Sequence, residues 1–357
     1  MKIIDIQTKQ VSLKRRKVFK IAFSASSYIR NVYVKVLTDE GIYGLGEGAP
    51  SALVTGDTVG TMMAAIEYMK ERLIGLDPTD IALIHETMDK TISRNTSAKA
   101  AIDIACYDIM GKVQGKSVHE LLGANINTLM TDMTIGIDTT ENMVKDALEW
   151  KEKGFRVLKL KAGIDHKEDL EHFEAIRDAI GDEMDLRVDF NQGYTEEIAA
   201  MMLDKIKEFG ISEAEQPLKD WNMEGMKRLK ESAEIPVMMD ESVKLPYDAE
   251  IACKYDMCDI INIKLMKCGG IYPALQICEI AKKYNKPCLI GCMGESKLGI
   301  AAGAAVFVAN DVIHDADLDS FMAIADSTES VTGGFAIQND VITLSDKPGF
   351  GFDDYEF

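Results

Sequence analysis

The stretch RVLKLKAG, residues 156–163, alternates between apolar and charged side chains. Leu158 and Leu160 fall on one face of a β-strand with a period of two residues. Lys159 and Lys161 fall on the other face. Segments with helical periodicity precede and follow the stretch, so we expect a central strand that is covered on both sides. Because a buried ammonium group is unfavourable unless it is paired or neutralised, the two lysines raise the question of what pairs with them.

Other strand candidates occur at regular intervals along the chain. Including residue 156, they begin near residues 130, 156, 185, 212, 236, 260, 287 and 312, one every 24 to 29 residues. Eight strands with intervening helices predict a parallel (β/α) barrel. A doubly wound open sheet is the alternative, although such sheets usually have fewer strands. No helix is evident after the eighth strand, where residues 333–352 predict a hairpin and a tail that packs on the N-terminal module.

The first 125 residues have a different pattern. Residues 1–50 predict strands, including a hairpin with a turn at Asp39, Glu40 and Gly41, and residues 58–74 and 97–123 have helical periodicity. The glycines at positions 44, 46 and 48 do not form a dinucleotide-binding motif, because no helix begins there. We therefore expect an α+β capping domain at 1–125, a catalytic barrel at 126–325 and a C-terminal tail at 326–357 that returns to the cap.

Composition narrows the class of protein. The chain has 357 residues, is 46% hydrophobic and has a formal charge of −19, which disfavours nucleic acid and anionic membranes as partners. No apolar run approaches 18 residues, and the N-terminus lacks the apolar centre of a signal peptide. The seven cysteines form no CxxC pair and indicate a reduced chain in which most of them pack as small hydrophobic residues. We expect a cytoplasmic protein.

Polar residues at the predicted strand ends repeat with the period of the strands. In barrels of this kind, chemistry takes place at the C-terminal ends of the strands. One such residue per strand is difficult to explain by chance. The set comprises Thr134, Lys161, Asp189, Glu215, Asp240, Lys264, Cys292 and Asp317.

Three of these residues predict a metal site. Asp189, Glu215 and Asp240 end three adjacent strands, and their carboxylates would repel one another unless a cation joined them. Ligation by oxygen alone suits Mg²⁺, which keeps other positions for water and substrate. The alternative is three separately solvated acids at helix N-termini, where Asp and Glu are favoured.

Two lysines predict a pair of bases. Lys161 and Lys264 end strands that lie four apart in a ring of eight, so they should face each other across the barrel mouth and flank the metal. This arrangement suits two bases that act on opposite faces of one carbon. Lysine fits the role because its pKa falls on burial or beside other cations, such as Lys159 and a metal. The alternative for a single lysine at a strand end is a side chain that reaches to solvent.

The eighth strand carries two further carboxylates. Asp317 and Asp319 fall on the same face in DADLDS and would hold a cationic group such as a free amino terminus. The run does not fit a calcium loop, since Ser320 stands where Gly is needed and Asp326 where Glu is needed. Helix-capping or solvated acids are the alternative.

Taken together, these motifs resemble the enolase superfamily, in particular its muconate-lactonizing-enzyme subgroup, over nearly the whole chain. The resemblance implies a (β/α)7β barrel with a cap formed from both ends of the chain. It also implies one Mg²⁺ per subunit that binds a substrate carboxylate, with Lys159 donating to its oxygens. The matching segments are KLK (159–161), DFNQ (189–192), EQP (215–217), DES (240–242) and NIKLMKCGG (262–270).

Within this subgroup, the Asp317/Asp319 pair resembles the dipeptide epimerases. The implied reaction inverts the α-carbon of the C-terminal residue of L,L or L,D dipeptides, with Lys161 serving the S centre and Lys264 the R centre. A small-molecule dipeptide substrate and a homo-oligomer are expected. N-acylamino acid racemase, o-succinylbenzoate synthase and muconate cycloisomerase are alternatives that have no evident need for the aspartate pair. A mandelate-racemase-like enzyme is disfavoured because no histidine ends strand six or seven.

The cap loop bears on the choice of substrate. Ser24 stands where epimerases acting on Ala-Glu carry an arginine that pairs with the glutamate side chain. A buried substrate carboxylate would lose its counter-ion, so we expect hydrophobic or aromatic C-terminal residues, although Arg30 could substitute and permit Ala-Glu. Thr134, Cys292 and Gly294 are expected as pocket walls. From another class, a non-catalytic metabolite-binding barrel would tolerate loss of the lysines, so their presence argues against it.

Overall fold

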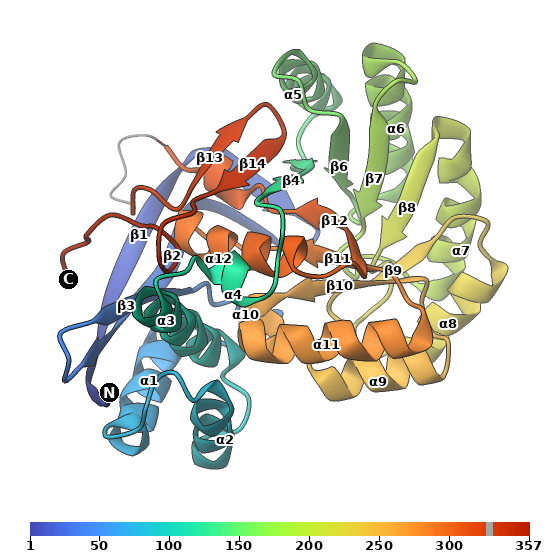
Figure 1. Cartoon of the computed structure of the whole chain (residues 1–357). Coiled ribbons are helices and arrows are strands. Elements are labelled where there is room, and N and C mark those ends of the chain that lie inside the picture. The colour runs from blue at the N-terminus through green and yellow to red at the C-terminus, as the bar shows by residue number, and fades with distance from the viewer. Residues whose placement is uncertain (326–330) are drawn as a thin grey trace.

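The computed structural model describes residues 1–325 and 331–357, so the predicted start of the tail at residue 326, including Asp326, lies outside the described residues. An eight-stranded sheet of parallel pairs forms the centre, with strand order following chain order (Figure 1). Each strand begins within three residues of its prediction. The strands are β5 (Met133–Ile135), β6 (Val157–Lys161), β7 (Asp185–Asp189), β8 (Ile211–Glu215), β9 (Val237–Met239), β10 (Ile260–Lys264), β11 (Cys288–Gly291) and β12 (Ile313–Asp317).

The sheet closes into the predicted barrel between its first and last strands. Asp132 N donates to Ala316 O at 3.0 Å, and Leu318 N donates to Thr131 Oγ1 at 2.8 Å. Closure removes the unpaired edges of the sheet, so the C-terminal strand ends lie in one ring and their side chains share one mouth. The (β/α) barrel is therefore confirmed, and the open-sheet alternative is wrong.

Helices surround the barrel. Several begin at residues whose side chains accept hydrogen bonds from the first turn, among them Thr139, Asp165, Thr195 and Ser296. In agreement with the sequence pattern, no α-helix follows β12 within the described residues, and the short 3₁₀ helix η2 (Ser320–Ala323) occurs there instead. The surrounding helices are α5 (Thr140–Glu152), α6 (His166–Ile180), α7 (Glu196–Lys205) with the 3₁₀ turn η1 (Ile206–Phe209), α8 (Met223–Ser232), α9 (Pro246–Lys254), α10 (Leu265–Cys268), α11 (Ile271–Tyr284) and α12 (Lys297–Val308).

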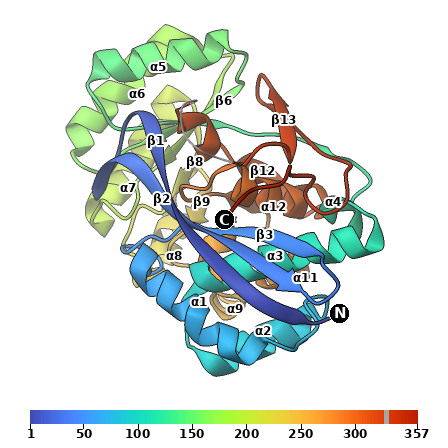
Figure 2. The ribbon, with the colours of Figure 1, turned by 90° about the vertical axis from the view of Figure 1, so that its left-hand side faces the viewer.

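The N-terminal module packs an antiparallel sheet on helices. Strands β1 (Ile3–Ile21), β2 (Ser24–Thr38) and β3 (Tyr43–Gly48) pair in sequence order. Helices α1 (Val59–Leu73), α3 (Thr96–Gln114) and α4 (Val118–Leu121) match the predicted helical regions, whereas α2 (Ile81–Thr91) was not predicted. The long β1–β2 hairpin extends across the barrel (Figure 2).

Glycines 44, 46 and 48 allow α3 to approach β3 closely. A Cβ atom at Gly44 or Gly46 would overlap the carbonyl oxygen of Ala105 or Ala101, and one at Gly48 would meet Ser97 O at 2.5 Å. Backbone approach of this kind requires the absence of a side chain. The expectation that these are structural glycines, and not part of a dinucleotide site, is confirmed.

Both ends of the chain contribute to the cap. Strands β13 (Phe335–Gln338) and β14 (Val341–Leu344) form the predicted hairpin, which pairs with β4 (Thr128–Met130). The tail then returns to the N-terminal module, where Gly349 N donates to Lys116 O at 2.9 Å and Phe350 N donates to Asp108 Oδ1 at 3.0 Å. All seven cysteines are buried and unpaired, in agreement with their predicted packing role. Among the described residues, no helix is long and apolar enough to cross a bilayer.

A buried glutamate joins the cap to the barrel. Glu47 on β3 accepts hydrogen bonds from Ser296 N at 3.0 Å and from Gly299 N at 2.8 Å, at the beginning of α12. Asn31 on β2 donates to both Glu47 Oε1 at 2.7 Å and Gly294 O at 2.8 Å. Glu295 lies nearby, where burial and the charge of Glu47 raise its pKa to about 8. The cap is thus held to the turn between β11 and α12.

This contact predicts that stability depends on pH through Glu295. In the unfolded chain a glutamate has a pKa near 4.3, so between about pH 4.5 and pH 8 the folded state binds more protons and loses stability as the pH rises. The isosteric E295Q variant removes this loss. A pKa of about 8 against one near 4.3 corresponds to a loss on the order of 5 kcal/mol above pH 8. Since about 1 kcal/mol corresponds to ~2–4 °C, we expect the Tm of E295Q to exceed that of the wild type by roughly 10–20 °C at pH 9, and the two Tm values to be equal near pH 4. A constant difference at all pH values would contradict the assignment.

Candidate active site

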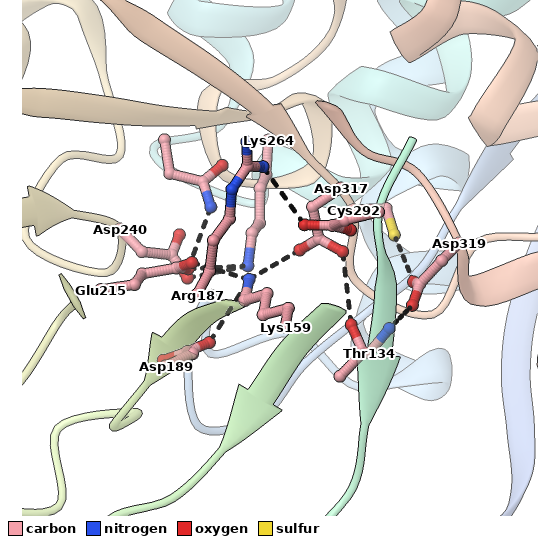
Figure 3. Close-up of polar contacts among 12 residues, drawn as sticks. Thr134, Lys159, Arg187, Asp189, Glu215, Asp240, Lys264, Cys292, Asp317 and Asp319 are labelled. Carbon is pink, nitrogen blue, oxygen red and sulfur yellow. Dashed lines mark hydrogen bonds and ion pairs between the residues drawn. The ribbon is translucent and has the colours of Figure 1, made fainter. Parts of the chain in front are cut away.

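The polar residues predicted at the strand ends meet at the barrel mouth. Lys159, Asp189 and Asp240 are at most 2% exposed, and Lys161, Glu215 and Lys264 are at most 8% exposed. They come from neighbouring parallel strands whose registers place Lys161 beside Asp189 and Asp189 beside Glu215. Figure 3 shows the central part of the cluster, with Lys159 between the triad of carboxylates and Asp317.

Asp189, Glu215 and Asp240 form the predicted acidic cluster. One carboxylate oxygen from each lies within 4.8 Å of the others, and all three side chains are buried. Burial and the charge of Asp189 raise the pKa of Glu215 to about 8. Burial opposes ionisation of Asp240 as well, but Lys264 and Lys267 outweigh it and lower its pKa. This set of oxygen donors fits a hard divalent cation such as Mg²⁺.

Each carboxylate of the cluster also contacts a lysine. Lys161 Nζ lies 2.5 Å from Asp189 Oδ2, and Lys264 Nζ lies 2.8 Å from Asp240 Oδ2. The two lysines therefore form ion pairs with the first and the last carboxylate of the triad. They belong to β6 and β10, which lie four strands apart. This arrangement agrees with the predicted placement of two amines that flank the acidic cluster.

The neighbouring carboxylates determine the protonation of Lys264. Burial lowers the pKa of Lys264, but the carboxylates of Asp240 and Glu215 outweigh burial and hold that pKa well above its usual value. The expectation of a lowered pKa included the charge of a metal at the acidic cluster, so it stays a prediction for the metal-loaded site.

Lys159 connects the acidic triad to the eighth strand. It is 1% exposed, and its Nζ lies 2.7 Å from Glu215 Oε2 and 2.7 Å from Asp317 Oδ2. Burial disfavours its charge, yet the surrounding carboxylates, Asp317 first, raise its pKa well above the usual value. Lys159 is therefore held as an ammonium group. Its ion pairs with Glu215 and Asp317 explain how a buried strand can carry this charge.

Asp317 and Asp319 have different environments. Burial raises the pKa of Asp317, but Lys159 outweighs it, and the pKa is lowered to about 2. Asp319 accepts a hydrogen bond from Thr134 N at 2.7 Å, and Cys292 Sγ lies 3.9 Å from its Oδ1. Burial and the charge of Asp317 raise the pKa of Asp319. Among the described residues no lysine or arginine forms an ion pair with Asp319, so it is the carboxylate better placed to receive an external cation.

Several supporting side chains in the site have no predicted role. Lys267 is 1% exposed, pairs with Asp240 and donates to Asn262 O at 2.9 Å. Asn262 Nδ2 donates to Glu215 Oε1 at 2.9 Å, and Gln216 Oε1 accepts from Asp240 N at 2.9 Å. Asn262 falls two residues before Lys264 on the same face of β10, so strand alternation could have identified it.

A cavity of about 250 Å³ lies between the cap and the barrel mouth. Six of the predicted site residues line it, namely Ser24, Lys161, Asp240, Lys264, Cys292 and Gly294. Thr134, Asp317 and Asp319 do not line the cavity and adjoin it through Cys292. The cap side is largely apolar, with Phe19, Ile21, Phe23, Ile29 and Val54, and it also carries Arg15 and Arg30.

Comparison with known proteins defines the family. The model of the mandelate racemase / muconate lactonizing enzyme N-terminal domain matches residues 3–123, and that of the enolase C-terminal domain-like family matches residues 142–354. The chain therefore belongs to the mandelate racemase / muconate lactonizing enzyme family of the enolase superfamily, as its motifs predicted.

Similar proteins narrow the class of reaction. The L-Ala-D/L-Glu epimerase of Clostridium acetobutylicum is 40% identical, covering 99% of both chains. The N-succinyl-L-Arg/Lys racemase of Bacillus cereus is 34% identical, covering 99% of this chain and 95% of that protein. The crystal structure of the Enterococcus faecalis V583 dipeptide epimerase with Mg and L-Leu-L-Tyr has a TM-score of 0.96 and 37% identity, covering 99% of this chain and 100% of the other. The chain is an isomerase of the racemase and epimerase type.

Proposed function

We propose that this enzyme is a Mg²⁺-dependent dipeptide epimerase that inverts the α-carbon of the C-terminal residue. The observation that carries the proposal is a pair of ion pairs at opposite ends of one buried acidic cluster. Lys161 pairs with Asp189 at one end, and Lys264 pairs with Asp240 at the other. The crystal structure of the similar E. faecalis enzyme contains Mg and a dipeptide, which supports the same ligands here.

The proposed roles follow from the chemistry of an α-proton. Asp189, Glu215 and Asp240 would hold one Mg²⁺ per subunit, which supplies positive charge for the substrate carboxylate and for the enolate charge that develops there. The α-carbon next to a carboxylate is a weak acid. The site must therefore stabilise the developing negative charge as well as move the proton. Lys159 adds a permanent ammonium group for the same oxygens.

The two end lysines divide the proton transfers. One removes the α-proton from its face of the carbon, and the other delivers a proton to the opposite face, which inverts the centre. We assign Lys161 to the S centre and Lys264 to the R centre. Each base must be neutral to accept a proton, and the charge of a cation bound to the acidic cluster offsets the carboxylates that now hold Lys264 protonated.

Asp317 and Asp319 would bind the ammonium group of the dipeptide. Asp319 has no cationic partner among the described residues, and Thr134 N fixes its carboxylate at 2.7 Å. N-acylated amino acids lack this ammonium group and would leave Asp319 without a counter-ion. This argument favours free dipeptides over N-acylamino acids, o-succinylbenzoate precursors and muconates.

The cavity supports a hydrophobic or aromatic C-terminal side chain. Ser24 lines it and supplies no charge, and the surrounding cap residues Ile21, Phe23 and Val54 are apolar. Cys292 and Gly294 form the opposite wall. Arg30 is exposed, so a substrate carboxylate there would gain little from it in water. The proposal includes a cytoplasmic homo-oligomer that acts on small molecules alone.

A dipeptide library in D₂O tests this function directly. With enzyme and Mg²⁺, we expect L-Ala-L-Xaa peptides with large apolar Xaa to gain one deuterium at the terminal α-carbon, measured by mass spectrometry. L-Ala-L-Glu should exchange more slowly. The dipeptide assignment is wrong if N-succinyl amino acids exchange and free dipeptides do not, and faster exchange of L-Ala-L-Glu would refute only the hydrophobic preference.

A further inference from the structure

Arg15 is a half-buried cation on the cap side of the cavity. It belongs to β1 and lines the cavity, and its guanidinium group stacks on Phe19 with its carbon 4.9 Å from the ring centroid. Its Nε is fully buried and has no hydrogen-bond partner among the described residues, and no carboxylate within that part of the chain forms an ion pair with it. Neither the fold nor the proposed proton transfers use this side chain.

An unpaired guanidinium group in such a place requires an explanation. Removing a donor from water without providing an acceptor costs about 1–3 kcal/mol, and more for a charged group. The cation–π contact with Phe19 offsets part of this cost. The N–H groups of Arg15 point outward in the plane of the guanidinium group, so the stacked ring accepts no hydrogen bond from them. The remaining donors of Arg15 are therefore available to a molecule in the cavity.

The backbone fixes Arg15 beside the segment that follows η2, after the eighth strand. Arg15 forms an antiparallel bridge with Ile324, and Lys14 O accepts a hydrogen bond from Ala325 N at 2.9 Å. A Cβ atom at Gly294 would lie 3.7 Å from Arg15 Nη2, so the side chain reaches the turn after β11. Burial lowers the pKa of Arg15, and the nearby charge of Asp319 opposes that effect. Arg15 thus adjoins the aspartate that would bind the substrate ammonium group.

We propose that Arg15 binds an acidic side chain on the amino-terminal residue of the dipeptide, so that the preferred substrates are L-Glu-L-Xaa or L-Asp-L-Xaa with an apolar Xaa. The inference rests on the proposed dipeptide epimerase function. The ammonium group of such a residue meets Asp319 while its side-chain carboxylate accepts hydrogen bonds from the guanidinium group, which pairs with carboxylates in a planar, two-point geometry.

The test compares three peptides with the Mg²⁺-loaded enzyme. L-Glu-L-Leu and L-Gln-L-Leu have nearly the same shape and differ in the side-chain charge, and L-Ala-L-Leu lacks the side chain. For the wild type we expect kcat/KM to be at least about tenfold higher for L-Glu-L-Leu than for L-Gln-L-Leu, mainly through KM. In R15Q this ratio should fall to about one, and R15K, which keeps the charge and loses the planar geometry, should give an intermediate ratio. K14Q removes the charge of an exposed neighbour on the same strand and should leave the ratio unchanged.

The outcomes separate this inference from the proposed function. Epimerisation of these peptides with a wild-type ratio near one overturns the role of Arg15 and leaves the dipeptide function intact. A fall of all three peptides by the same factor in R15Q also overturns it, because it indicates a structural role or a contact with the peptide carbonyl group. Absence of turnover on all three peptides overturns the proposed function and the inference together.

Discussion

The K264A variant is expected to lose epimerisation by about 10²–10⁴-fold, the usual contribution of a positioned acid or base. K161A should lose it to a similar degree, because inversion needs one proton transfer on each face of the carbon. The loss should appear in kcat and kcat/KM alike, since the lysines act on the transition state. Circular dichroism or chiral chromatography of the product measures the rate.

Hydrogen exchange distinguishes the two lysines. In D₂O, K264A should still exchange the α-proton of the enantiomer whose proton faces Lys161, and K161A should exchange only the other enantiomer. K145A removes an exposed lysine from α5 and serves as the control with wild-type rates. Undiminished epimerisation in either K161A or K264A would refute the two-base mechanism.

Removal of the divalent cation is expected to abolish turnover completely, and Mg²⁺ should restore it. Binding should also be visible without catalysis, because a ligand at 100 times its Kd stabilises the folded state by about 2.7 kcal/mol. We therefore expect Mg²⁺ to raise the Tm of the chelator-treated protein by several degrees in differential scanning fluorimetry. A Tm that is insensitive to Mg²⁺ would contradict the assignment of Asp189, Glu215 and Asp240.

The E215Q variant tests the site at a single atom. Glutamine keeps the shape of Glu215 and one acceptor oxygen, which can serve Asn262 or Lys159 but not both, because these two residues contact different oxygens of Glu215. The other carboxylate oxygen is replaced by a donor that cannot bind a cation. The Mg²⁺-induced rise in Tm should fall below 1 °C, with ~10²-fold or greater loss of activity. E213Q alters another buried glutamate of β8 and should keep the Mg²⁺ response. Equal responses of E215Q and wild type would remove Glu215 from the site.

Much of the active site could be predicted because its residues follow the period of the strands. Asp189, Glu215 and Lys264 each end a predicted strand, and barrel geometry then fixes their order around the mouth. The alternation in KLK likewise placed Lys159 and Lys161 on the inner face. Local sequence and one rule of topology were sufficient for these residues.

Other features depend on contacts between distant parts of the chain. Arg15 gains its position from pairing with Ile324, and no local pattern relates these two residues. Lys267 lies in the four-residue helix α10, where a lysine ordinarily faces solvent, and its burial follows from contact with Asp240. The pKa of Lys264 depends on the sum of all neighbouring charges, so a motif that identifies the residue does not give its protonation state.

The contact between the tail and the N-terminal module has a consequence for biosynthesis. Phe350 and Gly349 hydrogen-bond to Asp108 and Lys116, which emerge from the ribosome more than 230 residues earlier. The N-terminal module therefore cannot complete these contacts until residue 350 has been synthesised, even though domains generally fold as they are made. Until then, the surface of the N-terminal module on which the buried Phe350 packs stays uncovered.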